Sequence, residues 1–189
     1  MKKDILSRYE RSETDEIIID VSVGSIEDLY SYFDKAASYH KKDLDQDFVD
    51  YLIGCVKEIK NHKFLIRINL HKHESNERME RVRRSITNYF TYLNQVERQR
   101  LTKLINKSII YFCLGIALIT VSLTFKSTPE KDTAGVVLDI LKEGITIAAW
   151  VSMWQALANF IFGWNPHTQK IKIYRKIISA TLLFCYQRR

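Results

Sequence analysis

Apolar and polar residues alternate in two short stretches of the first half of the chain. In Glu16–Val23 and in Phe64–Leu70 every second residue is apolar. A period of two places alternate side chains on one face of a β-strand, so the pattern predicts two strands. The tail predicts a third strand around Thr181 to Tyr186. Because two strands alone are marginal in water, we expect the third to pair beside them.

Between these strands the apolar spacing changes to three and four residues, as in an amphipathic helix. Ser25, followed three residues later by Asp28, resembles a capping box and predicts the start of one helix. Its apolar stripe consists of Ile26, Leu29, Tyr30 and Phe33. A second helix is predicted from about Asp45 to Lys60.

The chain from Glu74 to Pro129 contains no proline before its last residue and one glycine, so a single long helix is expected. Its first half carries a seam of apolar residues at alternating three- and four-residue spacing. The seam comprises Met79, Val82, Ile86, Tyr89, Leu93 and Val96. It is expected either to cover the strands or to continue as a stalk that contacts neighbouring subunits.

Two long apolar runs occupy the second half of the chain, at 108–125 and 144–164, joined by a short loop at 126–143. Neither run contains Asp, Glu, Lys or Arg. Because a membrane-spanning helix needs roughly 20 mostly apolar residues, the runs predict a transmembrane hairpin in a lipid bilayer. Pro166 is expected to interrupt the helix after the second span.

Basic residues flank the two spans on the sides away from the loop. They are Arg98, Arg100, Lys103 and Lys107 before the first span and Lys170, Lys172, Arg175 and Lys176 after the second. Because Lys and Arg near spans stay in the cytoplasm, both termini are predicted to be cytoplasmic. These flanks account for much of the net charge of +7, so no nucleic-acid partner is expected.

These predictions define an α+β protein. Residues 1–105 form a small cytoplasmic α/β domain, ordered strand-helix-helix-strand, with a stalk helix. Residues 106–165 form the two-helix transmembrane hairpin, and residues 166–189 form a cytoplasmic tail whose strand returns to the α/β domain.

The chain carries no motif that points to catalysis. It has no Gly-rich phosphate loop, nucleophile elbow or Cys-x-x-Cys motif, and Cys55, Cys113 and Cys185 form no spaced pair. We therefore predict that the protein is not an enzyme and that it uses no cofactor or metal.

The candidate site within the membrane is a polar face on the second span. Ser152, Gln155 and Asn159 share this face at helical spacing. Such side chains need hydrogen-bond partners, either across helices of the hairpin or between subunits. Alternatively they line a water-filled path in a ring of subunits, because two helices per chain cannot enclose a pore.

The chain resembles a family of uncharacterised bacterial membrane proteins with two spans. The resemblance rests on FDKAASYHKKDLDQDFVDYLIGCVKEI at Phe33–Ile59 and on KEGITIAAWVSMWQALANFIFGWNPHTQKIKIYRKI at Lys142–Ile177. It implies a multi-pass protein of the bacterial inner (plasma) membrane, but no reaction or ligand. Ala156, Asn159 and Gly163 depart from the family pattern, in which proline and acidic or aliphatic residues are expected.

Two functional hypotheses follow. In the first, the protein is a homo-oligomer whose cytoplasmic domain controls or supports the hairpins, which act as a channel or perturb the membrane. In the second, a membrane-anchored module binds a cytoplasmic protein or a small ligand. Its candidate surface is the loop His40, Lys41, Lys42 and Asp43.

Overall fold

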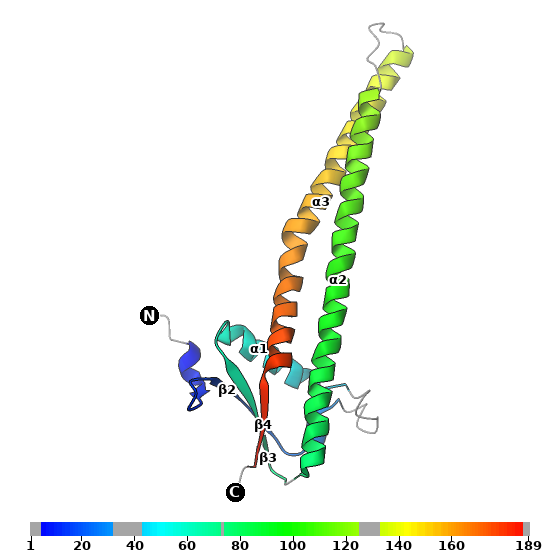
Figure 1. The fold of residues 1–189 in the computed structure, drawn as a ribbon. Helices are drawn as coiled ribbons and strands as arrows, with labels where there is room; N and C mark the ends of the chain where they lie inside the picture. Colours follow the sequence, from blue (N-terminus) through cyan, green and yellow to red (C-terminus); the bar gives the residue numbers. More distant parts are fainter. Residues whose placement is uncertain (1–4, 32–42, 73, 125–132, 187–189) are drawn as a thin grey trace. The chain divides into compact units, whose positions relative to one another are not determined.

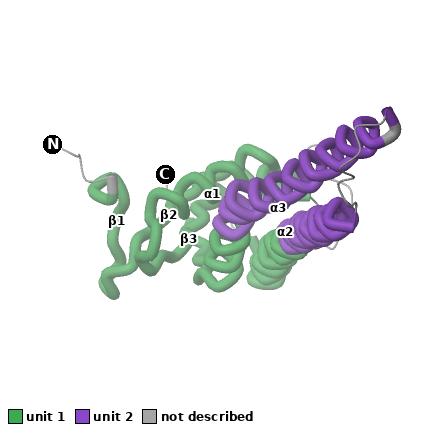
Figure 2. Tube along the Cα trace, turned by 90° about the horizontal axis from the view of Figure 1, so that it is seen from above, with its two compact units in different colours: residues 1–96, 170–189 green, residues 97–169 purple. Residues whose placement is uncertain are grey.

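The computed structural model describes residues 5–31, 43–72, 74–124 and 133–186. These residues form an α+β fold with a mixed sheet of four strands and three α-helices. The chain divides into two compact units (Figure 2). Unit 1 contains residues 1–96 and 170–189, and unit 2 contains residues 97–169. Residues from both ends of the chain therefore share unit 1.

The sheet of unit 1 has the order β1-β2-β3-β4. The strands are β1 (Glu10–Arg11), β2 (Ile17–Val23), β3 (Phe64–Leu70) and β4 (Thr181–Tyr186). Strand β1 pairs antiparallel with β2, whereas β2, β3 and β4 pair in parallel. The strand predicted in the tail is therefore present as β4 and pairs with β3 of its own chain.

Parallel neighbours cannot be joined by a tight hairpin, so each parallel pair in this sheet has a helical connection. Helix α1 (Gln46–Ile59) lies between β2 and β3, and Asp45 caps its first turn by accepting from the backbone N–H groups of Asp47 and Phe48. The connection from β3 to β4 contains α2 (Asn76–Thr124) and α3 (Thr133–Ser179) (Figure 1). The two apolar runs thus lie inside one crossover of the sheet.

The core of unit 1 lies on one face of the sheet. Ile19, Ile66 and Ile68 are fully buried there against residues of all three helices. The helices contribute Leu52 and Val56 from α1, Val82, Ile86 and Phe90 from α2, and Ile173 and Ile177 from α3. Fully burying one such side chain contributes roughly 1.5–3 kcal/mol. The seam at the start of α2 therefore covers the strands, while contact of a stalk with other subunits stays a prediction.

The helix predicted from Ser25 is replaced by a short 3-10 helix, η2 (Ile26–Leu29). The Ser25 N–H donates to the Asp28 carboxylate at 2.8 Å, as the capping pattern predicts. At Tyr30 the backbone becomes extended and forms a bridge with Leu44. This pairing uses the backbone groups that a longer helix would need, so the prediction of an α-helix was wrong at Tyr30. Phe33 lies outside the described residues.

Helix α3 is longer than the hydropathy pattern predicts. It begins at Thr133, so the second part of the expected 126–143 loop is helical. It also continues through Pro166, which was expected to interrupt it. Proline removes the backbone donor whose helical bond would go to the carbonyl oxygen of Phe162, while the following turn carries side-chain bonds of its own. Here the Thr168 hydroxyl donates to the carbonyl oxygens of Trp164 and Asn165 at 3.1 and 2.9 Å.

Candidate functional site

The predicted polar face on α3 satisfies its hydrogen bonds within that helix. The Ser152 hydroxyl donates to the Ala148 carbonyl oxygen at 2.9 Å. Gln155 donates through Nε2 to the Asn159 Oδ1 at 3.1 Å. Gln155 is exposed, while Ser152 and Asn159 are half-buried. The structure therefore places the three residues on one helix, but the bonds that they form do not join α3 to α2.

A different set of α3 residues faces α2 in unit 2, and most of its members are small. On α2, Ser108, Gly115 and Ser122 are buried at intervals of seven residues. On α3, Ala149 and Ala156 are buried, and Gly163 follows seven residues later. A repeat of seven keeps positions on one side of a packed helix, and small residues let two backbones approach closely. We call these six residues the small-residue seam.

The seam leaves no room for a larger side chain at its glycines. A Cβ atom on Gly115 would lie 2.6 Å from Cγ of Met153 and 3.2 Å from the carbonyl oxygen of Ala149. A Cβ atom on Gly163 would collide with the side chain of Leu104. The two helices thus depend on glycine for their close approach.

Side-chain hydrogen bonds of Ser122 join α2 to α3 at one end of the small-residue seam. The hydroxyl oxygens of Ser122 and Thr146 lie 2.7 Å apart. The Ser122 hydroxyl also lies 3.5 Å from the Lys142 carbonyl oxygen, which accepts from Thr146 at 2.8 Å. This bond joins the two helices of the hairpin, which is one of the roles that the sequence pattern left open for Ser152, Gln155 and Asn159.

A buried carboxylate lies near the other end of the seam. Glu97 of α2 has a side chain that is only 4% exposed, and its Oε1 lies 2.7 Å from Nδ1 of His167 on α3. Arg100 approaches Oε2 of the same carboxylate at 3.5 Å. Burying a carboxylate without partners is costly, so His167 and Arg100 stabilise Glu97 at this position.

The sequence contained a signal for this pair. Glu97 is the only Asp or Glu between Glu80 and Glu130. A lone acid among basic residues predicts an ion pair, either with Arg100 one turn away or with a residue of another element. The partner itself, His167, could not be identified before the pairing of the helices was known.

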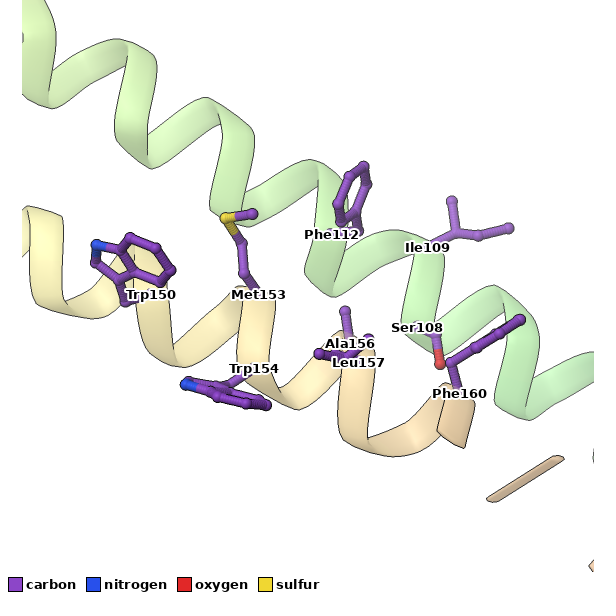
Figure 3. A pocket seen from close by; sticks show the side chains of 9 residues that line it. All are labelled: Ser108, Ile109, Phe112, Trp150, Met153, Trp154, Ala156, Leu157 and Phe160. Atoms are coloured by element: carbon purple, nitrogen blue, oxygen red, sulfur yellow. The ribbon is translucent and has the colours of Figure 1, made fainter. Parts of the chain in front are cut away.

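An apolar groove opens on the side of the hairpin where α2 and α3 meet (Figure 3). It encloses about 420 Å³. It is lined by Ser108, Ile109, Phe112, Trp150, Met153, Trp154, Ala156, Leu157 and Phe160. Trp150 and Trp154 are 60% and 65% exposed, so the groove is bordered by large aromatic side chains that the described residues of unit 2 leave mostly uncovered.

The outer surface of unit 2 is apolar well beyond this groove. Leu123 and Phe162 are 77% and 76% exposed, and Ile110 and Ile140 are both 65% exposed. The two helices of the hairpin are long and apolar enough to span a membrane, by length and composition. Only 11% of the most apolar stretch of each helix is buried.

The predicted binding loop falls mostly outside the structure. His40, Lys41 and Lys42 lie outside the described residues. Asp43 is exposed, and its carbonyl oxygen accepts from the Ser31 N–H at 3.0 Å. The observed role of Asp43 is therefore to extend the pairing next to the Tyr30–Leu44 bridge.

Unit 1 carries a polar network on the sheet face opposite the core. Arg67 donates through Nε and Nη2 to the Asp20 carboxylate at 2.5 and 2.7 Å, and through Nη2 to Glu10 at 2.6 Å. Asn69 also donates to Asp20, at 3.3 Å. Hydrogen bonds to the two carboxylates raise the pKa of Arg67 further above its usual value. The network joins β1, β2 and β3.

The described residues contain no group of three or more His, Cys, Asp or Glu side chains that could hold a metal ion. Comparison with protein-family models, with curated proteins and with solved structures finds no match to this chain. The hypotheses about its function therefore rest on the residues themselves.

Proposed function

We propose that the chain is an integral membrane protein whose hairpin spans a lipid bilayer and whose α/β unit supports that hairpin from the cytoplasm. The observation that carries the proposal is the exposed apolar surface of unit 2, on which Leu123 and Phe162 are more than three-quarters exposed. Water-soluble monomers rarely expose an apolar patch of more than a few hundred Å². A hydrocarbon environment removes the free-energy cost of exposing that surface to water.

The bonding within the hairpin agrees with a nonpolar environment. In hydrocarbon every backbone group must find a partner, and helices achieve this internally. The hydroxyls of Thr120, Ser122 and Ser152 each reach a carbonyl oxygen of the helices or another hydroxyl. Polar side chains in the hairpin are thus largely satisfied without water.

The orientation rests on the basic flanks. Arg98, Arg100 and Lys103 are exposed on α2 before the apolar stretch, and Lys170 and Lys172 are exposed on α3 after it. The positive-inside rule favours a cytoplasmic position for both flanks and hence for both termini. We assign the protein to the inner membrane of a bacterium, as the family resemblance implies.

The proposal includes assembly into a homo-oligomer, channel-like or membrane-perturbing. Gln155 supports assembly, because it is an exposed amide on an otherwise apolar stretch and uses only one of its donors on Asn159. A second copy of the hairpin would satisfy its remaining donor and its carbonyl oxygen. Two helices per chain can enclose a path for ions only as a ring of subunits.

The first test uses the full-length protein in two steps. Membranes are washed with alkaline carbonate, and an integral protein stays in the pellet until detergent is added. The mass of the purified protein in nanodiscs then gives the number of subunits. Release by carbonate would contradict membrane insertion, and a monomeric mass would contradict the homo-oligomer.

A second test asks whether the assembly conducts. Liposomes containing the wild type are compared with liposomes containing Gln155→Leu and Asn159→Leu. A channel that depends on the polar face would lose its ion flux in these variants. Ile110→Leu, a change at an exposed apolar position of α2, is the matched control and should leave the flux unchanged. Equal flux in all liposomes would contradict a conducting role for Gln155 and Asn159.

The alternative function is a membrane-anchored module that binds a protein or a small ligand. One observation favours it, namely that the hydrogen bonds of Ser152, Gln155 and Asn159 stay within α3, as an anchor would allow. Its test is a pulldown with the detergent-solubilised protein, comparing wild type with a variant in which Lys41, Lys42 and Asp43 are changed to alanine. A specific partner that is lost in the variant would support this function.

A further inference from the structure

The two exposed flanks of α3 differ in chemistry. One flank carries Trp150, Trp154 and Leu157, at spacings of four and three residues. The other carries the polar face, Ser152, Gln155 and Asn159, at spacings of three and four. At roughly 100° per residue the centres of these two sets lie almost opposite each other around the helix, with the small-residue seam between them.

The tryptophan flank has donors without acceptors. Among the described residues, neither the Trp150 nor the Trp154 indole N–H donates a hydrogen bond. Both residues are at least 60% exposed along one side of α3, beside the groove that Phe112 and Ile109 border from α2 (Figure 3). A buried indole N–H normally finds an acceptor, and a lipid chain offers none at this depth.

The polar flank has an acceptor without a donor, the carbonyl oxygen of Gln155. The Gln155 Nε2 donates to Asn159, which leaves the Gln155 carbonyl oxygen without a donor among the described residues.

The two flanks also match in depth. The residues of both sets fall between positions 150 and 159 of one helix, so they lie at the same level of the bilayer when copies stand side by side.

We propose that the tryptophan flank and groove of one copy bind the polar flank of α3 of a second copy. This inference rests on the proposed homo-oligomer and specifies its interface. The indole N–H groups of Trp150 and Trp154 donate to side chains of the polar flank, Gln155 first among them. The polar flank of α3 of the second copy fills the apolar groove. Tryptophan is enriched among residues that dominate binding at interfaces.

Because the two flanks are different surfaces, the contact is heterologous. Such a contact repeats from copy to copy and closes into a ring when the rotation allows. In this arrangement Gln155 lies between subunits, so a loss of ion flux in Gln155→Leu would follow from loss of the ring and not from a change in the wall of a path.

The experiment combines two tagged copies of the full-length protein, coexpressed in one membrane. One copy carries Trp154→Cys and the other carries Gln155→Cys, both with Cys113→Ser because Cys113 is exposed on α2. A short membrane-permeant bismaleimide should join the two introduced cysteines and give a product that carries both tags. Copies that carry Ile110→Cys in place of Trp154→Cys are the matched control and should give no product, since Ile110 lies outside both flanks.

The outcomes separate this inference from the proposed function. A product between position 154 of one copy and position 155 of the other supports the heterologous contact. A product only between two copies of Gln155→Cys, in a protein that is oligomeric in nanodiscs, overturns it and favours a symmetric dimer. A monomeric mass together with no product overturns both proposals.

A second measurement does not depend on crosslinking. Trp150→Phe with Trp154→Phe keeps the aromatic rings and removes both donors. We expect this double variant to shift the nanodisc mass toward the monomer, and Gln155→Leu to produce the same shift. An unchanged mass in both variants would contradict the hydrogen bonds that define the contact.

Discussion

The two units of this protein differ in where their large apolar side chains lie, buried in unit 1 and exposed in unit 2. In unit 1, Ile19, Ile66 and Ile68 are completely buried against three helices. In unit 2 the largest apolar side chains point outward, and the buried positions of the seam are occupied by Ser, Gly and Ala. Unit 1 is organised as in water, where burial of large apolar groups is the main gain. Unit 2 has the organisation expected in hydrocarbon, the environment that we propose for it, where close packing and hydrogen bonds hold helices together.

The largest expected effect is a loss of stability on truncating the core of unit 1. Ile66→Ala removes a fully buried side chain, and such changes cost about 2–5 kcal/mol. Ile110→Ala in unit 2, where the side chain is 65% exposed, should cost little in a lipid environment. Chemical unfolding of the detergent-solubilised protein measures both. Equal losses would contradict the proposed difference in environment.

A second prediction concerns the small-residue seam between α2 and α3. Gly115→Leu places a side chain where even a Cβ atom lies 2.6 Å from Met153. Overpacking of this kind costs about 1–3 kcal/mol, and we expect the pairing of α2 with α3 to loosen. Ala117→Leu, at an exposed position of the same helix, is the control. Amide hydrogen exchange should rise in unit 2 of the Gly115 variant alone, and exchange that rises only in unit 1 would refute this account.

A third prediction tests the pair Glu97–His167. His167→Ala removes the closest partner of a carboxylate that is 4% exposed, while Arg100 stays at 3.5 Å. Leaving a buried polar group poorly satisfied costs about 1–3 kcal/mol, and Arg100 favours the lower half of that range. Adding Glu97→Gln removes the charge and should recover part of the stability. Thermal unfolding in nanodiscs distinguishes the variants, and identical melting temperatures would show that the pair contributes nothing.

A smaller effect is expected at the bond between the two helices. Ser122→Ala removes the 2.7 Å contact with Thr146, and bonds between membrane helices average about 0.6 kcal/mol. Thr146→Val should cost a similar amount. Because both changes remove the same contact, the double variant should lose less stability than the sum of the losses in the two single variants. Strict additivity would mean that the two hydroxyls act independently.

The smallest effect is a pH dependence confined to unit 1. Burial and the 2.7 Å hydrogen bond to Glu58 raise the pKa of Tyr9 above its ordinary value of 10.0. The folded state then holds the phenol proton more tightly than the unfolded state, so this stability is complete below pH 10.0 and falls as the pH rises above it. Tyr9→Phe should show a shallower alkaline decline in urea unfolding. A decline identical to that of the wild type would rule out Tyr9 as its source.

The periodic pattern predicted helices and strands well where local spacing and capping alone decide the structure. The alternation in Phe64–Leu70 matches β3, and the acidic start at Asp45 matches the cap of α1. The pattern was wrong at Tyr30 and Pro166. At Tyr30 a bridge to Leu44 ended the expected helix, whereas at Pro166 helix α3 continues through the proline. The first error arises because a local signal competes with pairing to a residue distant in sequence, and the second because a proline can kink a long helix without ending it.

For the candidate site, the sequence identified a polar face on the correct helix. Among the described residues its hydrogen bonds stay within α3, and a role between subunits stays a prediction. Ser152, Gln155 and Asn159 do lie on one face of α3, since helical spacing alone decides that. The partners of Ser152 and Gln155 lie within α3, whereas the Ser122–Thr146 contact and the burial of Glu97 depend on the register in which α3 packs against α2. Spacing within one helix contains no information about that register.

The amino-acid sequence by itself determined two long apolar helices, an α+β fold and a polar face on the second apolar run, because periodicity and hydropathy are properties of single segments. Only the tertiary structure decided that both helices form one crossover between β3 and β4, that glycines set their approach, and that His167 meets Glu97. Those features arise from packing between segments, in which each helix defines the surface available to the other.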